Sequence, residues 1–212
     1  MAGLTRGTRM VLRASEKYSR IAKAYDLIEW PIERILFHKL RKEAIESACD
    51  KTLEVGVGTG KNLPYYPKGV ELVAIDFSPG MLNIAEKKAK GLGLKSLQLR
   101  EMDVEHLDFT SNSFDVVVST FVFCTVPDPL AGLKELYRVL KPNGKAVFLE
   151  HMQSKNTIIN IMLHIMNIVS SNFLGTSMVR KTQQNIEQAG FVINSVENKA
   201  FDIVRLIIAE KK

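Results

Sequence analysis

The chain has 212 residues, of which 46% are hydrophobic, and a formal net charge of +6 with an isoelectric point near 9.3. This length allows one sizeable core and is too short for two full domains, so we expect a single domain over residues 1–212. The two cysteines, Cys49 and Cys124, form neither a disulfide framework nor a C-x-x-C metal motif, which indicates a reduced, cytoplasmic protein without structural metal. Residues 1–25 are polar and basic and contain no apolar core of a signal peptide.

Residues 1–49 are expected to form a helical cap ahead of the main fold. Aromatic and apolar side chains recur there at helical spacing, and a separate face is basic, with Arg13, Lys17 and Arg20. Such a helix can lie on an anionic membrane surface. An ordinary capping helix with a solvated basic face has the same pattern, so both interpretations stay open.

An apolar strand near 51–56 then breaks into three glycines, Gly56, Gly58 and Gly60. Only glycine lets a ligand approach the main chain so closely, and a helix N-terminus nearby would add further N–H donors. The next strand, near 70–76, ends in Asp76, where a carboxylate can accept both hydroxyls of a ribose. Together these features predict a nucleoside-cofactor site at the carboxyl end of a parallel sheet.

The glycine spacing distinguishes between cofactors. The dinucleotide fingerprint G-x-G-x-x-G has its third glycine three residues after the second, whereas the glycines here alternate and position 61 is lysine. Glu54, just before the loop, suits a cationic ligand and would repel a pyrophosphate. The pattern therefore disfavours a dinucleotide.

Strands and helices alternate along the rest of the chain. Helices are predicted near 79–91, 129–140 and 178–189, and strands near 96–102, 114–119, 144–150, 191–197 and 203–209. Gly190 ends the last helix, and the two final strands read as an antiparallel hairpin. This order is typical of an α/β fold.

The pattern E-x-G-x-G-x-G at 54–60 resembles the first motif of the class I S-adenosylmethionine (SAM) methyltransferases. Three further segments match that family in order and spacing: D-F-S-P-G-M-L at 76–82, E-M-D-V-E at 101–105 and S-F-D-V-V-V-S-T-F at 113–121. The resemblance is dense over residues 50–150. It implies a doubly wound, mostly parallel seven-stranded Rossmann-like sheet, with SAM as cofactor and S-adenosylhomocysteine as product.

The resemblance also implies which residues bind SAM. Asp103 would take the adenine amino group, Phe77 and Met81 would cover the nucleoside, and the end of the fourth strand would lie under the methionine part. Tyrosines of the N-terminal segment would fold over the cofactor. The full cofactor-binding set is Tyr18, Glu54, Gly56, Gly58, Gly60, Asp76, Phe77, Met81, Asp103, Val104, Thr120 and Phe121.

A helical insertion is predicted after the fifth strand, over 151–178. Between 156 and 179 there is no formally charged side chain, and 158–169 is apolar around most of a helix. The run is too short and interrupted to span a bilayer, which needs about 20 apolar residues. Three interpretations of the insertion stay open: an apolar lid, a surface that enters the membrane interface, and a buried core helix.

The catalytic candidates are Glu150 and His151, which follow the fifth strand, and Tyr25. Methyl transfer from a sulfonium is an in-line displacement, and an amine or a ring carbon as acceptor requires a base. His151 could be that base, could bind a phosphate, or could simply be satisfied by backbone. Arg180 could bind an anionic headgroup, although a solvated helix start explains it as well.

We expect a small lipophilic acceptor. The Glu150-His151 pair resembles the equivalent point in small phospholipid methyltransferases, so the lead acceptor is the amine of phosphatidylethanolamine. A quinone-precursor ring carbon and then a thiol are the alternatives, and a SAM-binding protein without turnover is an alternative of another class. Peripheral contact with an anionic membrane is expected. Nucleic acid is disfavoured because no aromatic-basic interleaving marks a stacking surface.

Overall fold

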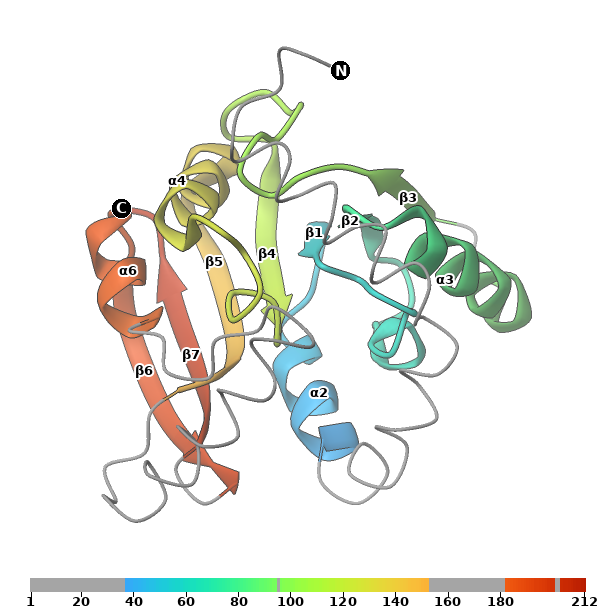
Figure 1. Cartoon of the computed structure of the whole chain (residues 1–212), viewed down its shortest axis with the longest axis horizontal. Coiled ribbons are helices and arrows are strands. Elements are labelled where there is room, and N and C mark those ends of the chain that lie inside the picture. The colour runs from blue at the N-terminus through green and yellow to red at the C-terminus, as the bar shows by residue number, and fades with distance from the viewer. Residues whose placement is uncertain (1–36, 95, 153–181, 201–202) are drawn as a thin grey trace.

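The computed structural model describes residues 37–94, 96–152, 182–200 and 203–212 (Figure 1). The N-terminal basic stripe, Tyr18, Tyr25, the uncharged insertion and Arg180 lie outside the described residues. Their predicted roles therefore stay predictions, as does the single-domain organisation of the whole chain.

Seven strands form one sheet in the order β3-β2-β1-β4-β5-β7-β6, in which only β7 runs against the others. The strands are β1 (Lys51–Val55), β2 (Glu71–Asp76), β3 (Leu97–Glu101), β4 (Phe114–Thr120), β5 (Leu140–His151), β6 (Val192–Lys199) and β7 (Val204–Glu210). The helices are α2 (His38–Ile45), α3 (Pro79–Leu92), α4 (Pro129–Val139), α6 (Thr182–Gln188) and the 3-10 turn η2 (Leu63–Tyr65). The predicted α/β class and seven-stranded, mostly parallel sheet are confirmed.

One strand begins earlier than the sequence pattern indicates. Strand β5 starts at Leu140, which pairs with Phe114, and the register then shifts before Val116 pairs with Lys145. Asn143 has a positive φ of 62° in this irregular stretch, and its N–H donates to the Lys211 carbonyl at 2.7 Å. The turn residues 141–144 are therefore a bulge within the strand and not a loop ahead of it.

Helices α3 and α4 begin with the same arrangement of residues. Each has a polar N-cap followed by proline at the first helical position, which lacks the N–H that a helix start leaves unbonded. Ser78 caps α3 through the N–H of Met81, and Asp128 caps α4 through the N–H of Ala131. Both helices therefore start at a fixed point near the carboxyl ends of the strands.

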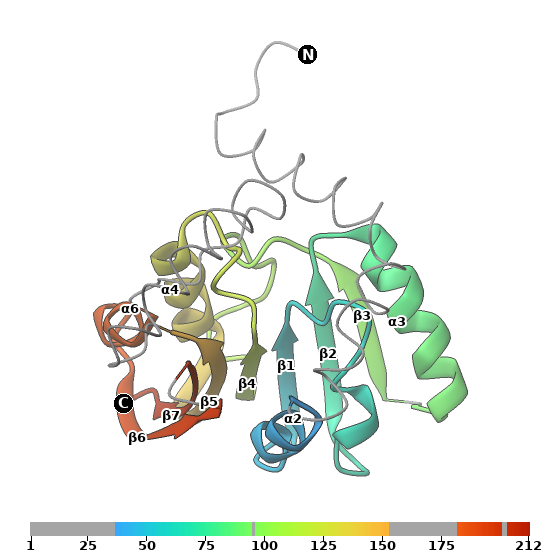
Figure 2. The same ribbon diagram turned by 60° about the horizontal axis from the view of Figure 1, so that its bottom comes forward.

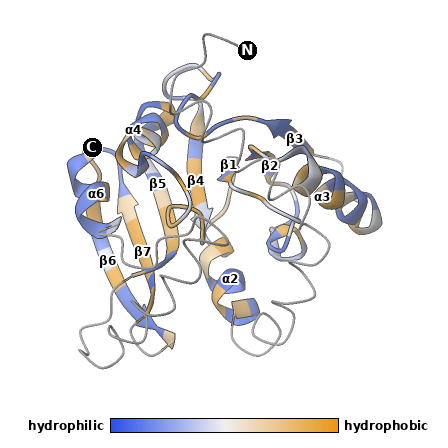
Figure 3. Ribbon diagram, viewed as in Figure 1, coloured by the Kyte–Doolittle hydropathy of each residue, from blue (hydrophilic) through white to orange (hydrophobic). Residues whose placement is uncertain are grey.

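Helices pack on both faces of the sheet, so its central strands are buried on both sides. Along β4, Val117 packs in the cluster that holds α4 and α6, whereas Val116 and Val118 pack in the cluster that holds α2. Figure 3 shows hydrophobic residues concentrated in β4, β5 and β7. Strands β2, β1 and β4 lie side by side in Figure 2, so the ends of these three strands meet at one edge. In the described part of the chain, no helix is long and apolar enough to cross a membrane.

Phe148 provides a test of this core. Its side chain is fully buried, and its ring centroid lies 6.1 Å from that of Phe123 and 5.7 Å from that of Phe191. We expect Phe148→Ala to lower the free energy of unfolding by about 3–5 kcal/mol, because a cavity replaces the ring. Chemical denaturation measures this loss. Leu92→Ala, at a position that is 43% exposed, is the control and should cost less than about 0.5 kcal/mol.

Candidate active site

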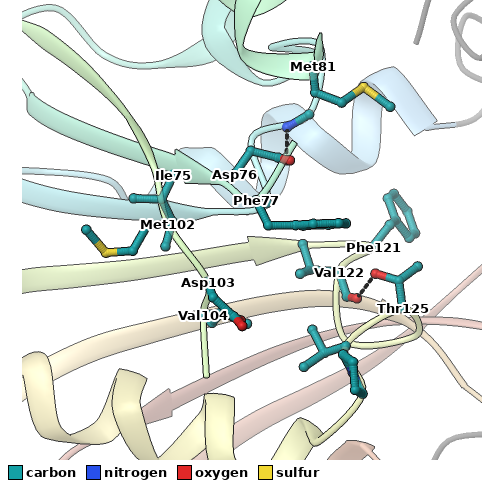
Figure 4. Close-up of a pocket in the computed structure, with 14 residues that line it drawn as sticks. Ile75, Asp76, Phe77, Met81, Met102, Asp103, Val104, Phe121, Val122 and Thr125 are labelled. Atoms are coloured by element: carbon teal, nitrogen blue, oxygen red, sulfur yellow. Dashed lines mark hydrogen bonds between the residues drawn. The ribbon is translucent and has the colours of Figure 1, made fainter. Parts of the chain in front are cut away.

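A pocket lies at the carboxyl ends of β1, β2 and β4 (Figure 4). It brings together these predicted cofactor residues: Gly56, Gly58, Asp76, Phe77, Met81, Asp103, Val104 and Phe121. The other lining residues, which the sequence did not indicate, are Ile75, Met102, Val122, Thr125, Val126 and Pro127. Motifs that are separated along the chain thus come together in one pocket.

The glycine loop forms one wall of the pocket. Gly56 has a φ of +64°, and a Cβ at this position would overlap the Val122 side chain, so a larger residue fits neither the backbone nor the space. The Gly58 N–H donates to Asp76 Oδ2 at 2.8 Å, a bond drawn in Figure 4. Gly60 does not line this pocket: a Cβ there would lie 2.7 Å from Leu63 Cδ1. Gly60 instead packs against Leu63 beneath the glycine loop.

Asp76 is buried at the end of β2 and is bound by main-chain donors. Besides Gly58, the Ser78 N–H donates to Asp76 Oδ1 at 2.9 Å. Burial raises the pKa of Asp76 to about 6, against the opposing effect of these amides. Asp103, after β3, is less buried, and its Oδ1 accepts from the Glu105 N–H at 3.0 Å.

Glu54 and Thr120 do not line the pocket but join a buried polar cluster with Asn62 and Arg41. Asn62 Nδ2 donates to Glu54 Oε1 at 2.7 Å and to Thr120 Oγ1 at 2.9 Å. Arg41 Nη1 donates to Thr120 Oγ1 at 2.8 Å and to Asn62 Oδ1 at 3.2 Å. The cluster ties α2 and the residues after the glycine loop to the ends of β1 and β4.

The Glu54 carboxyl group is fully enclosed by this cluster. Burial raises its pKa to about 7, while Asn62, Tyr66 and the Arg41 charge act in the other direction. The Tyr66 hydroxyl lies beside this carboxyl group, and a side-chain hydrogen bond between the two lowers the pKa of Glu54 and raises that of Tyr66.

Two members of the cluster were missed at the sequence level. Asn62 comes two positions after Gly60, and a polar side chain so close to the glycine loop could have marked it as a site residue. Arg41 gave no signal, because arginine on a helix is usually exposed, whereas this side chain is only 7% exposed.

The catalytic candidates His151 and Glu150 lie beside the pocket rather than in its lining. The His151 ring centroid is 4.6 Å from that of Phe121, which does line the pocket, and 5.8 Å from that of Phe37. Burial and then the Arg41 charge lower the pKa of His151 to about 4, so its imidazole is neutral at pH 7. Glu150 is fully buried, which raises its pKa to about 7. Cys124 is buried.

The buried acids make stability depend on pH in an unusual direction. Glu54, Asp76 and Glu150 have pKa values of about 7, 6 and 7 in the fold, above the ordinary 4.5, 3.8 and 4.5. The folded state therefore binds more protons than the unfolded chain between about pH 4 and 7, so stability from these groups is lost as the pH rises through that range. His151, with its lowered pKa, acts in the opposite direction but is one group against three.

We therefore expect the ligand-free protein to be more stable at about pH 5.5 than at about pH 8. Urea unfolding at the two pH values measures the difference. The double variant Glu54→Gln, Glu150→Gln is the control and should show a much smaller change with pH. Equal pH dependence in the variant and the parent protein would contradict the assignment of the effect to these acids.

Comparison with known proteins agrees with this geometry. Residues 53–148 match the family model of a methyltransferase domain. The chain is 35% identical over 136 residues to a phosphatidylethanolamine N-methyltransferase of Cereibacter sphaeroides, covering 63% of this chain and 67% of that protein. It is 37% identical over 153 residues to a demethylmenaquinone methyltransferase of Lactobacillus johnsonii, covering 68% of this chain and 63% of that protein, slightly less than two thirds of its length.

A solved structure shows the shared fold. The structure of a SAM-dependent methyltransferase from Aquifex aeolicus matches with a TM-score of 0.67 at 22% identity, covering 90% of this chain and 97% of that one. The chain belongs to the SAM-dependent methyltransferases, with S-adenosylmethionine as its cofactor.

Proposed function

We propose that the protein transfers the methyl group of SAM to the amine of a phospholipid headgroup, with phosphatidylethanolamine as the lead acceptor. The observation that carries the proposal is the place of His151, whose ring centroid lies 4.6 Å from that of the pocket residue Phe121. An amine must lose its proton before its lone pair can attack, and the His151 imidazole is the proposed acceptor of that proton. The relative from Cereibacter sphaeroides, named for phosphatidylethanolamine, supports the substrate class.

The residues of the pocket fit SAM as the methyl donor. We infer that Glu54, two positions before Gly56 and hydrogen-bonded to Asn62, favours the ammonium end of SAM by its negative charge, since its buried carboxyl group does not line the pocket. Gly56 lets Val122 pack against the main chain at the pocket wall, and Asp76, which lines the pocket, supplies acceptors for ribose hydroxyls. Asp103 is the proposed adenine ligand. When bound, SAM supplies a methyl group activated by its sulfonium.

The pocket is lined mainly by apolar side chains, among them Phe121, Val122, Val126 and Pro127, which can exclude water from the bound ligand. This composition supports a small lipophilic acceptor. Positive charge supports peripheral contact with an anionic membrane, since the net formal charge is +6.

A second candidate acceptor is a ring carbon of a quinone precursor. It is favoured by the relative from Lactobacillus johnsonii, which is named a demethylmenaquinone methyltransferase and is 37% identical. The same neutral imidazole could raise the electron density of a phenol by removing its proton. The two candidates therefore differ in the acceptor and not in the role of His151.

We expect Asp76→Ala to weaken the binding of S-adenosylhomocysteine by roughly 1–3 kcal/mol, the cost of lost hydrogen bonds to a charged group. Titration calorimetry measures this change, and Asp108→Ala at an exposed position is the control. In the parent protein, affinity should fall as the pH drops below about 6, where Asp76 becomes protonated. Unchanged affinity in Asp76→Ala would disprove the ribose assignment.

We expect His151→Ala to reduce turnover by about 10²-fold while S-adenosylhomocysteine affinity stays near that of the parent protein. Labelled SAM is incubated with vesicles that contain phosphatidylethanolamine and, separately, with a demethylated quinol. His38→Ala, an exposed histidine of α2, is the matched control. Label in the quinol with none in phosphatidylethanolamine would reject the phospholipid proposal in favour of the second candidate.

A further inference from the structure

The loop after β4, residues 121–127, forms much of the pocket wall, and neighbouring groups must hold its backbone in place. We call this segment the β4 loop; its pocket-lining members are Phe121, Val122, Thr125, Val126 and Pro127. Phe121 has a φ of +60°, a left-handed conformation that is unfavourable for a residue with a bulky side chain. Such a backbone persists only where its surroundings hold it.

The Glu150 carboxylate binds this loop directly. Its Oε1 accepts from the Ser119 hydroxyl at 2.7 Å, from the Val122 N–H at 3.1 Å and from the Phe123 N–H at 3.4 Å. The side chain is fully buried. One carboxylate oxygen on β5 therefore binds the two main-chain amides that directly follow the left-handed Phe121.

The position of the β4 loop determines both sides of the pocket. The Val122 side chain packs against Gly56, in space that a Cβ on that glycine would fill. The Phe121 ring lies beside His151, and the guanidinium carbon of Arg41 lies 5.0 Å from its centroid. A shift of the loop would therefore move a wall of the cofactor pocket and the neighbour of the proposed base together.

We infer that Glu150 is a positioning residue, which holds the β4 loop against the glycine loop and does not itself exchange a proton with the acceptor. Oε1 is bound by three donors, and Oε2, which has no hydrogen bond among the described residues, is buried with the rest of the side chain and outside the pocket lining. The inference rests on the proposed function only for the acceptor side, since the cofactor pocket depends on the same loop.

Glutamine and alanine distinguish positioning from proton transfer at this site. In Glu150→Gln, an amide oxygen can accept the same three hydrogen bonds, but the side chain cannot act as a base. In Glu150→Ala, the amides of Val122 and Phe123 lose their acceptor. Ser119→Ala removes one donor and leaves both amides bound, so it is the matched control.

The first measurement is amide hydrogen exchange of the ligand-free protein by NMR, together with calorimetry of S-adenosylhomocysteine. We expect Glu150→Ala to speed exchange at Val122 and Phe123 and to weaken S-adenosylhomocysteine binding, each by about tenfold or more. Glu150→Gln and Ser119→Ala should stay within about threefold of the parent protein in both measurements. Neither measurement requires a methyl acceptor, so both results remain valid whether or not the phospholipid proposal fails.

The second measurement is methyl transfer with the acceptor that the labelled-SAM assay identifies. Glu150→Gln should retain turnover within about tenfold, with an unchanged pH profile. Loss of turnover in Glu150→Gln with normal amide exchange and normal S-adenosylhomocysteine binding would overturn the inference, because it would make Glu150 a base. Unchanged exchange at both amides in Glu150→Ala would also overturn it. If Glu150→Ala does not fold, the glutamine variant alone decides between the two roles.

Discussion

Three buried carboxylates at one edge of the sheet hold the site together. Glu54, Asp76 and Glu150 lie at or near the ends of β1, β2 and β5, and each accepts hydrogen bonds from a loop or turn that forms or supports the pocket. Their raised pKa values record what this arrangement costs in desolvation. Ionised groups of this kind suit a sulfonium cofactor, and the hydrogen bonds from neighbouring residues offset part of the desolvation cost.

Arg41 balances the charge of this edge. Its guanidinium group is bound to Asn62 and Thr120, and its charge lowers the pKa of Glu54, Glu150 and His151 alike. One cation thus favours the ionised state of the two acids and the neutral state of the histidine. The helix that carries Arg41, α2, precedes the cofactor motif, so the electrostatics of the site depend on a segment outside it.

Much of the lining of the pocket could be predicted because its residues follow strand ends. Gly56, Asp76, Asp103 and Phe121 each come at the end of a parallel strand or within two residues of it, and parallel strands in neighbouring positions end at the same edge. Spacing along the chain was therefore enough to place them together. Gly60 and Thr120 also belong to the predicted motifs, but they do not line the pocket. Gly60 packs against Leu63, and Thr120 is hydrogen-bonded within the buried polar cluster.

The sequence by itself determined the α/β class, since this depends on periodicity, and its glycine and acid motifs disfavoured a dinucleotide. The mostly parallel sheet and SAM as cofactor followed from the resemblance of those motifs to the class I SAM methyltransferases. Only the tertiary structure decided the partners of the buried polar groups. Arg41 meets Thr120 across 79 positions, and Glu150 reaches the β4 loop across 28, separations that carry no local pattern. The bonding of a buried side chain is set by which strands become neighbours, and that is a property of the whole fold.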